Sequence, residues 1–102
     1  METKNFNELV NSTQPVVIDF FTEWCGPCKA MKPVLENLKS RLGDKVKIIK
    51  IDIDENPDIA SQLDIRSVPT LMIFQNGERK WRKIGISSVS EMESVITQLS
   101  LN

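Results

Sequence analysis

The sequence predicts an α/β fold in which a mixed β-sheet of four or five strands carries helices on both faces. An apolar run at residues 16–21, a helix-periodic segment at 29–42 and a β-branched run at 46–53 form a βαβ unit. Such a unit requires a parallel strand pair with a right-handed crossover. Further along, Asn76-Gly77 separates two short strand-like segments and predicts an antiparallel hairpin. Parallel and antiparallel strands therefore belong to the same sheet.

In the first half of the chain, residues 6–10 are expected to form a short helix. The run 16–21 is apolar on both of its faces, which is typical of a central strand that helices cover on each side. Asp19 is the one polar side chain in that run, and the alternation of the strand places it on a covered face. The helix at 29–42 contains Pro33, which is expected to kink it. Its apolar face carries Met31, Val34, Leu35, Leu38 and Leu42.

The second half adds a helix, the hairpin and a final helix. Asn56 and Pro57 predict the N-cap and the first turn of a short helix. Residues 71–74 and about 80–84 are expected to be the two strands of the hairpin. The segment 88–91 has the Ser-x-x-Glu pattern of a capping box and predicts the start of the C-terminal helix.

Length and composition limit the class of protein. The chain has 102 residues, which suits one core, so we expect a single domain over residues 1–102. The formal net charge of −1 lacks the basic excess that binding to nucleic acid or to a membrane surface uses. No basic region followed by an apolar stretch marks a secretory signal at the N-terminus. We therefore expect a cytoplasmic protein, monomeric, without nucleic-acid or membrane partners.

The two cysteines, Cys25 and Cys28, stand between the first predicted strand and the helix that follows it. The N-terminal end of a helix stabilises negative charge, so a reactive thiolate is well placed there. A structural disulfide between them would close a loop too short to stabilise the fold much. A zinc site wants four ligands, mostly Cys and His, and the chain has two cysteines and no histidine. Neither of these alternatives explains the flanking Trp24, Gly26 and Pro27.

The motifs along the chain, in order, are Asp19, Trp24-Cys25-Gly26-Pro27-Cys28, Pro33, Lys50, Val68-Pro69-Thr70, Asn76-Gly77 and Gly85. Beside a βαβ pattern, this set identifies the whole chain as similar to the thioredoxin family. The resemblance implies the thioredoxin fold and a dithiol–disulfide reductant that acts on disulfide-containing proteins. It implies no metal, and no cofactor other than the redox-active disulfide itself. It also implies recycling by a flavin-dependent thioredoxin reductase that uses NADPH.

The chemistry of the motif and the resemblance together suggest a role for each site residue. Cys25, at the helix cap, is expected to attack a substrate disulfide, and Cys28, one turn in, to resolve the mixed disulfide. Gly26-Pro27 resembles the pair found in reductant members of the family and is expected to tune the redox poise. Burial is expected to raise the pKa of Asp19, which the resemblance places behind Cys28 as a general base. Lys50 either modulates Asp19 or is an exposed lysine at a strand edge.

A substrate-binding rim is expected opposite the thiols. About one X-Pro bond in twenty is cis in folded proteins, but the resemblance implies a cis Val68-Pro69 bond. That geometry would leave the Val68 backbone free to pair with an extended substrate strand. The apolar rim would consist of Trp24, Ile65, Val68, Gly85 and Ile86, next to Pro69. For Ile65 and Ile86 the alternative interpretation is ordinary core.

Three residues depart from the family's pattern. Phe21 stands where tryptophan is typical, so an indole donor is missing near the site. Ser67 stands where glycine often precedes the Val-Pro pair. Trp81 lies in a basic segment, where we expect a surface packing residue covered by lysine stems. A docking surface for an acidic partner is the alternative for Trp81.

Two other functions stay open from the sequence. One is a binding module in which the cysteines are incidental, and the undamaged motif argues against it. Survival of partner binding in a Cys25→Ser, Cys28→Ser double variant would favour that hypothesis. The other is an oxidase or isomerase of an oxidising compartment, which a redox potential above the family's reducing range would favour.

Overall fold

The computed structural model describes residues 1–101 and confirms a mixed sheet flanked by helices, here with four strands. Its elements in chain order are α1 (Thr3–Val10), β1 (Val16–Phe21), α2 (Gly26–Leu42), the 3-10 turn η1 (Gly43–Lys45), β2 (Lys47–Asp52), α3 (Pro57–Gln62), β3 (Thr70–Gln75), β4 (Glu78–Ile84) and α4 (Val89–Ser100). The strand order is β2-β1-β3-β4, with β1 parallel to β2 and antiparallel to β3. β3 and β4 form the antiparallel hairpin. Within residues 1–101, no helix combines the length and apolar character needed to cross a membrane.

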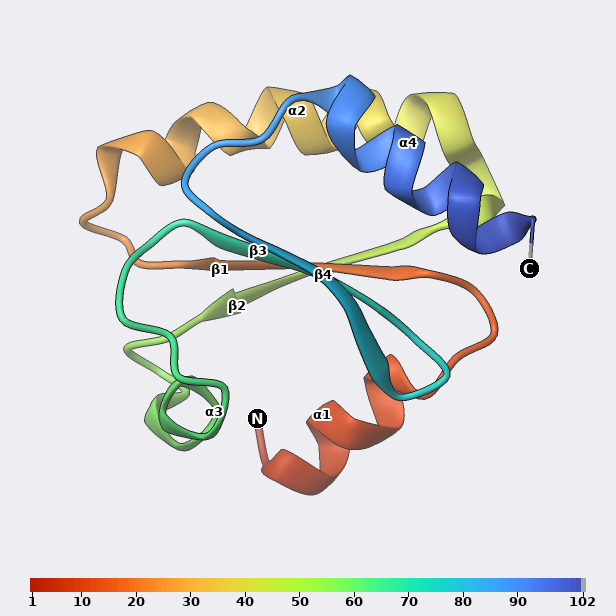
Figure 1. Cartoon of the computed structure of the whole chain (residues 1–102). Coiled ribbons are helices and arrows are strands. Elements are labelled where there is room, and N and C mark those ends of the chain that lie inside the picture. The colour runs from red at the N-terminus through yellow and green to blue at the C-terminus, as the bar shows by residue number, and fades with distance from the viewer. Residues whose placement is uncertain (102) are drawn as a thin grey trace.

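The sheet separates two hydrophobic cores, because β1 and β3 are apolar on both faces. Helices α2 and α4 cover one face and α1 and α3 cover the other (Figure 1). The upper core, beneath α2 and α4, consists of Val17, Met31, Leu35, Leu38, Val46, Leu71, Ile73, Met92 and Ile96. The lower core, above α1 and α3, consists of Phe6, Val10, Val16, Ile18, Phe20, Ile51, Ile59, Ile65, Met72 and Phe74. This two-sided burial is what the run at β1 predicted.

Helix α2 starts at Gly26, with Cys25 as its N-cap and a proline in its first turn, which confirms the expected place of Cys25 at the helix cap. Proline is favoured at that place because its fixed φ suits the first turn and its missing N–H is not needed there. The apolar periodicity at 29–42 marks only the part of the helix that follows the motif. The two-cysteine motif is therefore part of the helix itself. The helix continues through Pro33 and ends at Leu42, as predicted, with Gly43 as its C-cap at a φ of 54°.

The strand ends also differ by a few residues from the expected bounds. Asn76 and Gly77 both have positive φ, 53° and 79°, as a two-residue hairpin turn requires. Strand β4 consequently begins immediately after the turn, at Glu78 and not near residue 80. Strand β2 is one residue shorter at each end than the β-branched run 46–53.

The structure confirms Asn56 as the N-cap of α3 and Pro57 in its first turn, although Asn56 caps the helix without a side-chain bond. Asn56 occupies the cap position, but its side chain makes no hydrogen bond to the first turn of the helix. Its Nδ2 donates to the Asp52 carbonyl oxygen at 2.8 Å, and its Oδ1 accepts from the amino group of Met1. Asn56 therefore joins the end of β2 and the chain's first residue to the start of α3.

The capping box at α4 is half formed. Ser88 Oγ accepts a hydrogen bond from the Glu91 backbone N–H at 3.1 Å, as predicted. The Glu91 carboxylate does not complete the box, because it accepts from Lys83 Nζ at 2.6 Å and from Ser87 Oγ at 2.7 Å. Glu91 thus ties α4 to β4.

Candidate active site

The two cysteines lie at the N-terminus of α2 and form a disulfide, with Cα atoms 5.2 Å apart. The Cys28 backbone N–H donates to Cys25 Sγ at 3.0 Å. Cys25 is 9% exposed and Cys28 5% exposed, so Cys25 is the more accessible of the two by a small margin. An N–H donor and a helix N-terminus both favour negative charge on the Cys25 sulfur once the disulfide is reduced.

A backbone segment before β3 faces the disulfide. The Val68-Pro69 peptide bond is cis, which confirms the expectation from the resemblance. The Val68 carbonyl oxygen lies 3.5 Å from Cys25 Sγ, so residues distant in sequence meet at the reactive sulfur. The Pro69 carbonyl oxygen accepts from the Gly85 N–H at 2.8 Å, and Gly85 has a φ of 97° that favours glycine.

The apolar residues expected around the thiols fall into two groups. Trp24 is 88% exposed and Ile86 47% exposed, so both side chains are available at the surface. Ile65 is 9% exposed and belongs to the lower core, as its alternative interpretation held. Ile84 is 61% exposed and was missed, although it is paired with Thr70 directly after Pro69. Its place next to Gly85 at the end of a strand was the signal that could have identified it.

Asp19 is completely buried, as the strand alternation predicted. Neither of its carboxylate oxygens has a hydrogen-bond partner among residues 1–101. Desolvation raises the pKa of Asp19 to about 6 from 3.8, and the positive charge of Lys50 partly opposes that rise. Lys50 is the register partner of Asp19 in the parallel β1–β2 pair. An unpaired carboxyl that titrates near neutrality, below the helix that carries the cysteines, can exchange protons with a neighbouring group.

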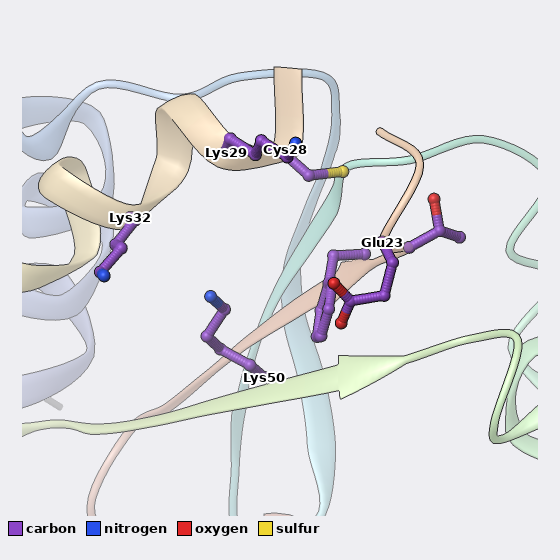
Figure 2. A pocket seen from close by; sticks show the side chains of 7 residues that line it. Glu23, Cys28, Lys29, Lys32 and Lys50 are labelled. Atoms are coloured by element: carbon purple, nitrogen blue, oxygen red, sulfur yellow. The ribbon is translucent and has the colours of Figure 1, made fainter. Parts of the chain in front are cut away.

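An open depression of about 260 Å³ lies beside the disulfide on the α2 side of the sheet. Phe21, Thr22, Glu23, Cys28, Lys29, Lys32 and Lys50 line it. Figure 2 shows the Lys50 ammonium and the Glu23 carboxylate pointing into this space, with the Cys28 sulfur at its edge. The Lys50 ammonium lies over the Phe21 ring, 5.1 Å from its centroid, which is a cation–π contact. Phe21 thus still fills its position without an indole donor.

Ser67 and Trp81, the other two residues that depart from the family's pattern, do not line this depression. Ser67 is exposed, and its carbonyl oxygen accepts from Thr70 Oγ1 at 2.7 Å. Trp81 is half-buried and packs against the upper core. It is a packing residue as expected, and its packing partner in the structure is the core beneath α2 and α4. Among residues 1–101, no group of three or more His, Cys, Asp or Glu side chains could hold a metal ion.

Known proteins of similar sequence match most of this chain. The thioredoxin family model matches residues 1–98. A thioredoxin of Rickettsia typhi is 50% identical over 80 residues, which are 78% of this chain and 76% of that protein. Thioredoxin 1 of Synechococcus elongatus is 49% identical over 72 residues, 71% of this chain and 67% of its own length.

Solved structures agree. The crystal structure of thioredoxin from Malassezia sympodialis superposes with a TM-score of 0.83 at 38% identity, covering 97% of this chain and 86% of its own. Mitochondrial thioredoxin 3 from Saccharomyces cerevisiae, in its oxidized form, gives a TM-score of 0.82 at 35% identity, with 93% and 88% covered. Since the family model spans residues 1–98, which include β1, the two-cysteine end of α2 and the hairpin, the chain belongs to the thioredoxin family and is a dithiol–disulfide oxidoreductase.

Proposed function

We propose that this chain is a general protein-disulfide reductant of the Trp-Cys-Gly-Pro-Cys type, built as one domain over residues 1–102. The observation that supports this most strongly is the position of Cys25 as the N-cap of α2, with the Cys28 N–H donating to its sulfur at 3.0 Å. The thiolate is the nucleophile in thiol–disulfide exchange, and both features stabilise it. Disulfide-containing proteins are the substrates of this reaction.

The proposed reaction has two exchange steps. The Cys25 thiolate attacks one sulfur of the substrate disulfide, which forms a mixed disulfide and releases the first substrate thiolate. The Cys28 thiolate then attacks Cys25 Sγ, which forms the Cys25–Cys28 disulfide and releases the second substrate thiolate. Two electrons pass from the dithiol to the substrate, and the protein is left in the oxidised form that the structure contains.

Asp19 is proposed as the general base that takes the proton from Cys28 before the second step, directly or through water. Its complete burial, its lack of a hydrogen-bond partner within residues 1–101 and its pKa of about 6 support this role. A base works best when its pKa lies near the working pH. Lys50 is proposed to keep the pKa of Asp19 from rising further.

Substrate binding is proposed at the face that carries the cis proline. An extended substrate segment would pair with the Val68 backbone next to Pro69, since Val68 lies beside the attacking sulfur. Gly85 would allow the segment to approach closely, and the exposed side chains of Trp24 and Ile86 would cover it. Ile65 contributes to the core beneath this surface.

The oxidised pair is proposed to be reduced by a flavin-dependent thioredoxin reductase that uses NADPH. The protein needs no cofactor of its own, because the two cysteines carry both electrons. Gly26-Pro27, with no histidine between the cysteines, resembles the reductant members of the family and supports the reducing direction. The protein is also proposed to be a monomer and to act in the reducing cytoplasm.

Insulin reduction with dithiothreitol tests the proposed function directly. The protein is expected to accelerate precipitation of the reduced insulin chains well beyond the rate with dithiothreitol alone. The Cys25→Ser, Cys28→Ser double variant is the matched control and should give the rate of dithiothreitol alone. No acceleration by the unaltered protein would exclude a general reductant.

Lys50→Met is expected to raise the pKa of Asp19 above about 6, because the variant removes the positive charge that lowers it. Carbon NMR of the Asp19 carboxyl group against pH measures this value. Lys47→Met, an exposed lysine on the same strand, is the control and should leave the titration unchanged. A lower or unaltered pKa in Lys50→Met would exclude the proposed role of Lys50.

A further inference from the structure

The side chain of Arg82 connects strand β4, at the edge of the sheet, to the end of α3. Arg82 Nη1 donates to the Leu63 carbonyl oxygen at 3.1 Å, and Nη2 donates to the Asp64 carbonyl oxygen at 3.0 Å. Arg82 is half-buried and is the register partner of Met72, which belongs to the lower core. The guanidinium therefore lies on the face of the sheet where α3 packs.

The two carbonyls are groups that need a donor. Leu63 is the C-cap of α3 and Asp64 lies beyond it, so neither carbonyl accepts a hydrogen bond from an N–H group of the helix. Asp64, directly beyond the helix C-cap Leu63, has a φ of 56°, a conformation that L residues rarely adopt. A planar guanidinium offers two parallel donors in a fixed fork, so one side chain satisfies both acceptors and fixes their orientation.

Gly85, the residue directly after β4, binds the other end of the loop. The Gly85 N–H, three residues after Arg82, donates to the Pro69 carbonyl oxygen at 2.8 Å. Within the loop, the Ile65 N–H donates to the Ala60 carbonyl oxygen at 2.8 Å. Arg82 on β4 and Gly85 directly after it therefore hydrogen-bond to the two ends of the segment 63–69.

The part of the loop between these two anchors is the part that faces the reactive sulfur. Val68 presents its carbonyl oxygen 3.5 Å from Cys25 Sγ, whereas Arg66 and Ser67 before it are exposed. Arg66 forms an ion pair with the Asp64 side chain at 2.8 Å, but both side chains are largely in solvent, where such a pair contributes little. The guanidinium of Arg82 is therefore the main side-chain anchor at the α3 end of the loop.

We propose that Arg82 is a positioning residue for substrate recognition: its fork on the Leu63 and Asp64 carbonyls sets the place of the Val68 backbone beside Cys25. This inference rests on the proposed function, in which the Val68 backbone pairs with an extended substrate segment. Arg82 touches neither cysteine in the hydrogen bonds it makes, so it acts on binding and leaves the thiol chemistry alone.

Arg82→Gln, measured with two disulfides, tests the proposal. The kcat/KM for insulin is expected to fall about tenfold, mostly through KM, because a charge-assisted anchor of the substrate-binding loop is lost. Reduction of dithiobis(nitrobenzoate), which is too small to pair with a backbone strand, should stay within about twofold of the unaltered protein. The kcat/KM of Arg82→Lys for insulin should lie between those of the unaltered protein and Arg82→Gln, since one ammonium cannot bind both carbonyls as the guanidinium fork does.

Arg79→Gln is the matched control. Arg79 is exposed on the same strand, and its side chain makes no hydrogen bond or ion pair within the part of the chain that the structure describes. This variant should keep full activity with both disulfides. Equal losses of Arg82→Gln with both disulfides, or no loss with insulin, would overturn the proposal. If Arg82→Gln does not fold, the same comparison is made with Arg82→Lys.

Amide hydrogen exchange separates this inference from the proposed function. Exchange at residues 65–68 should be faster in Arg82→Gln than in Arg79→Gln, whatever the substrates of the protein are. Failure of the unaltered protein to reduce insulin, with faster loop exchange in Arg82→Gln, would refute the proposed function and retain Arg82 as the anchor of this loop. Unchanged exchange in Arg82→Gln would refute the anchor itself.

Discussion

Cys28→Ser is expected to accumulate a covalent adduct between this protein and its substrate. Cys25 can still attack a substrate disulfide in this variant, but no second thiolate is present to attack Cys25 Sγ. Mass spectrometry under non-reducing conditions should detect the mixed disulfide, and dithiothreitol should release it. Turnover with insulin should fall to the rate of dithiothreitol alone, so the effect on the catalytic cycle is complete.

Cys25→Ser is the matched control for this trapping experiment. It should also abolish turnover, because a serine hydroxyl cannot supply the nucleophilic thiolate, but it should form no adduct. The distinction is informative because the two sulfurs differ so little in exposure, 9% against 5%. Accumulation of an adduct by Cys25→Ser, and not by Cys28→Ser, would reverse the assigned roles.

Local patterns were sufficient to predict most of the fold. β1 was recognisable because its two apolar faces require a covering layer on each side, and the structure has a core on each. The hairpin followed from Asn76-Gly77, since a two-residue turn with positive φ at both positions is nearly restricted to such residues. The burial of Asp19 followed from the same alternation that placed Val17 in the upper core.

The failures concern contacts whose partner lies elsewhere in the chain. Asn56 and Glu91 have the right residue types for local caps, but each forms bonds to distant groups, such as the amino group of Met1 and Lys83 Nζ. Helix-cap rules treat only neighbours in sequence, so they could not anticipate this competition. Ile65 was ambiguous for the same reason, because an isoleucine in a loop is core or surface depending on what packs beneath it.

In the active site too, the features set by local sequence were predictable, and those set by contacts distant in sequence were not. The spacing of the cysteines and their place at a helix start are local, and they were predictable from the sequence. The cis Val68-Pro69 bond was expected only through the resemblance, because an X-Pro sequence by itself favours trans. The fork of Arg82 on two carbonyls joins β4 to the end of α3 and has no signature in the sequence near either.

Asp19→Asn is expected to stabilise the folded protein at neutral pH while it slows the resolving step. The folded state raises the pKa of Asp19 from 3.8 to about 6, so ionising this buried carboxyl at pH 7 or above costs roughly 3 kcal/mol of folding free energy. An amide carries no charge and avoids this cost, although it also lacks hydrogen-bond partners at the site. We expect a gain of about 2 kcal/mol in the free energy of unfolding at pH 8, measured by denaturant titration of the oxidised protein.

The expected gain in stability of Asp19→Asn over the unaltered protein depends on pH. Between pH 4 and pH 6 the folded state holds the Asp19 proton more tightly than the unfolded chain, so stability falls as pH rises through this window. Below the unfolded pKa both states are protonated, and the advantage of Asp19→Asn should disappear. Asp44→Asn, at an exposed position, is the control and should leave the pH profile unchanged. If Asp19→Asn were no more stable than the unaltered protein at pH 8, desolvation of the Asp19 carboxylate could not be the cause of its raised pKa. The proposed role of Asp19 as a general base would then lose its physical basis.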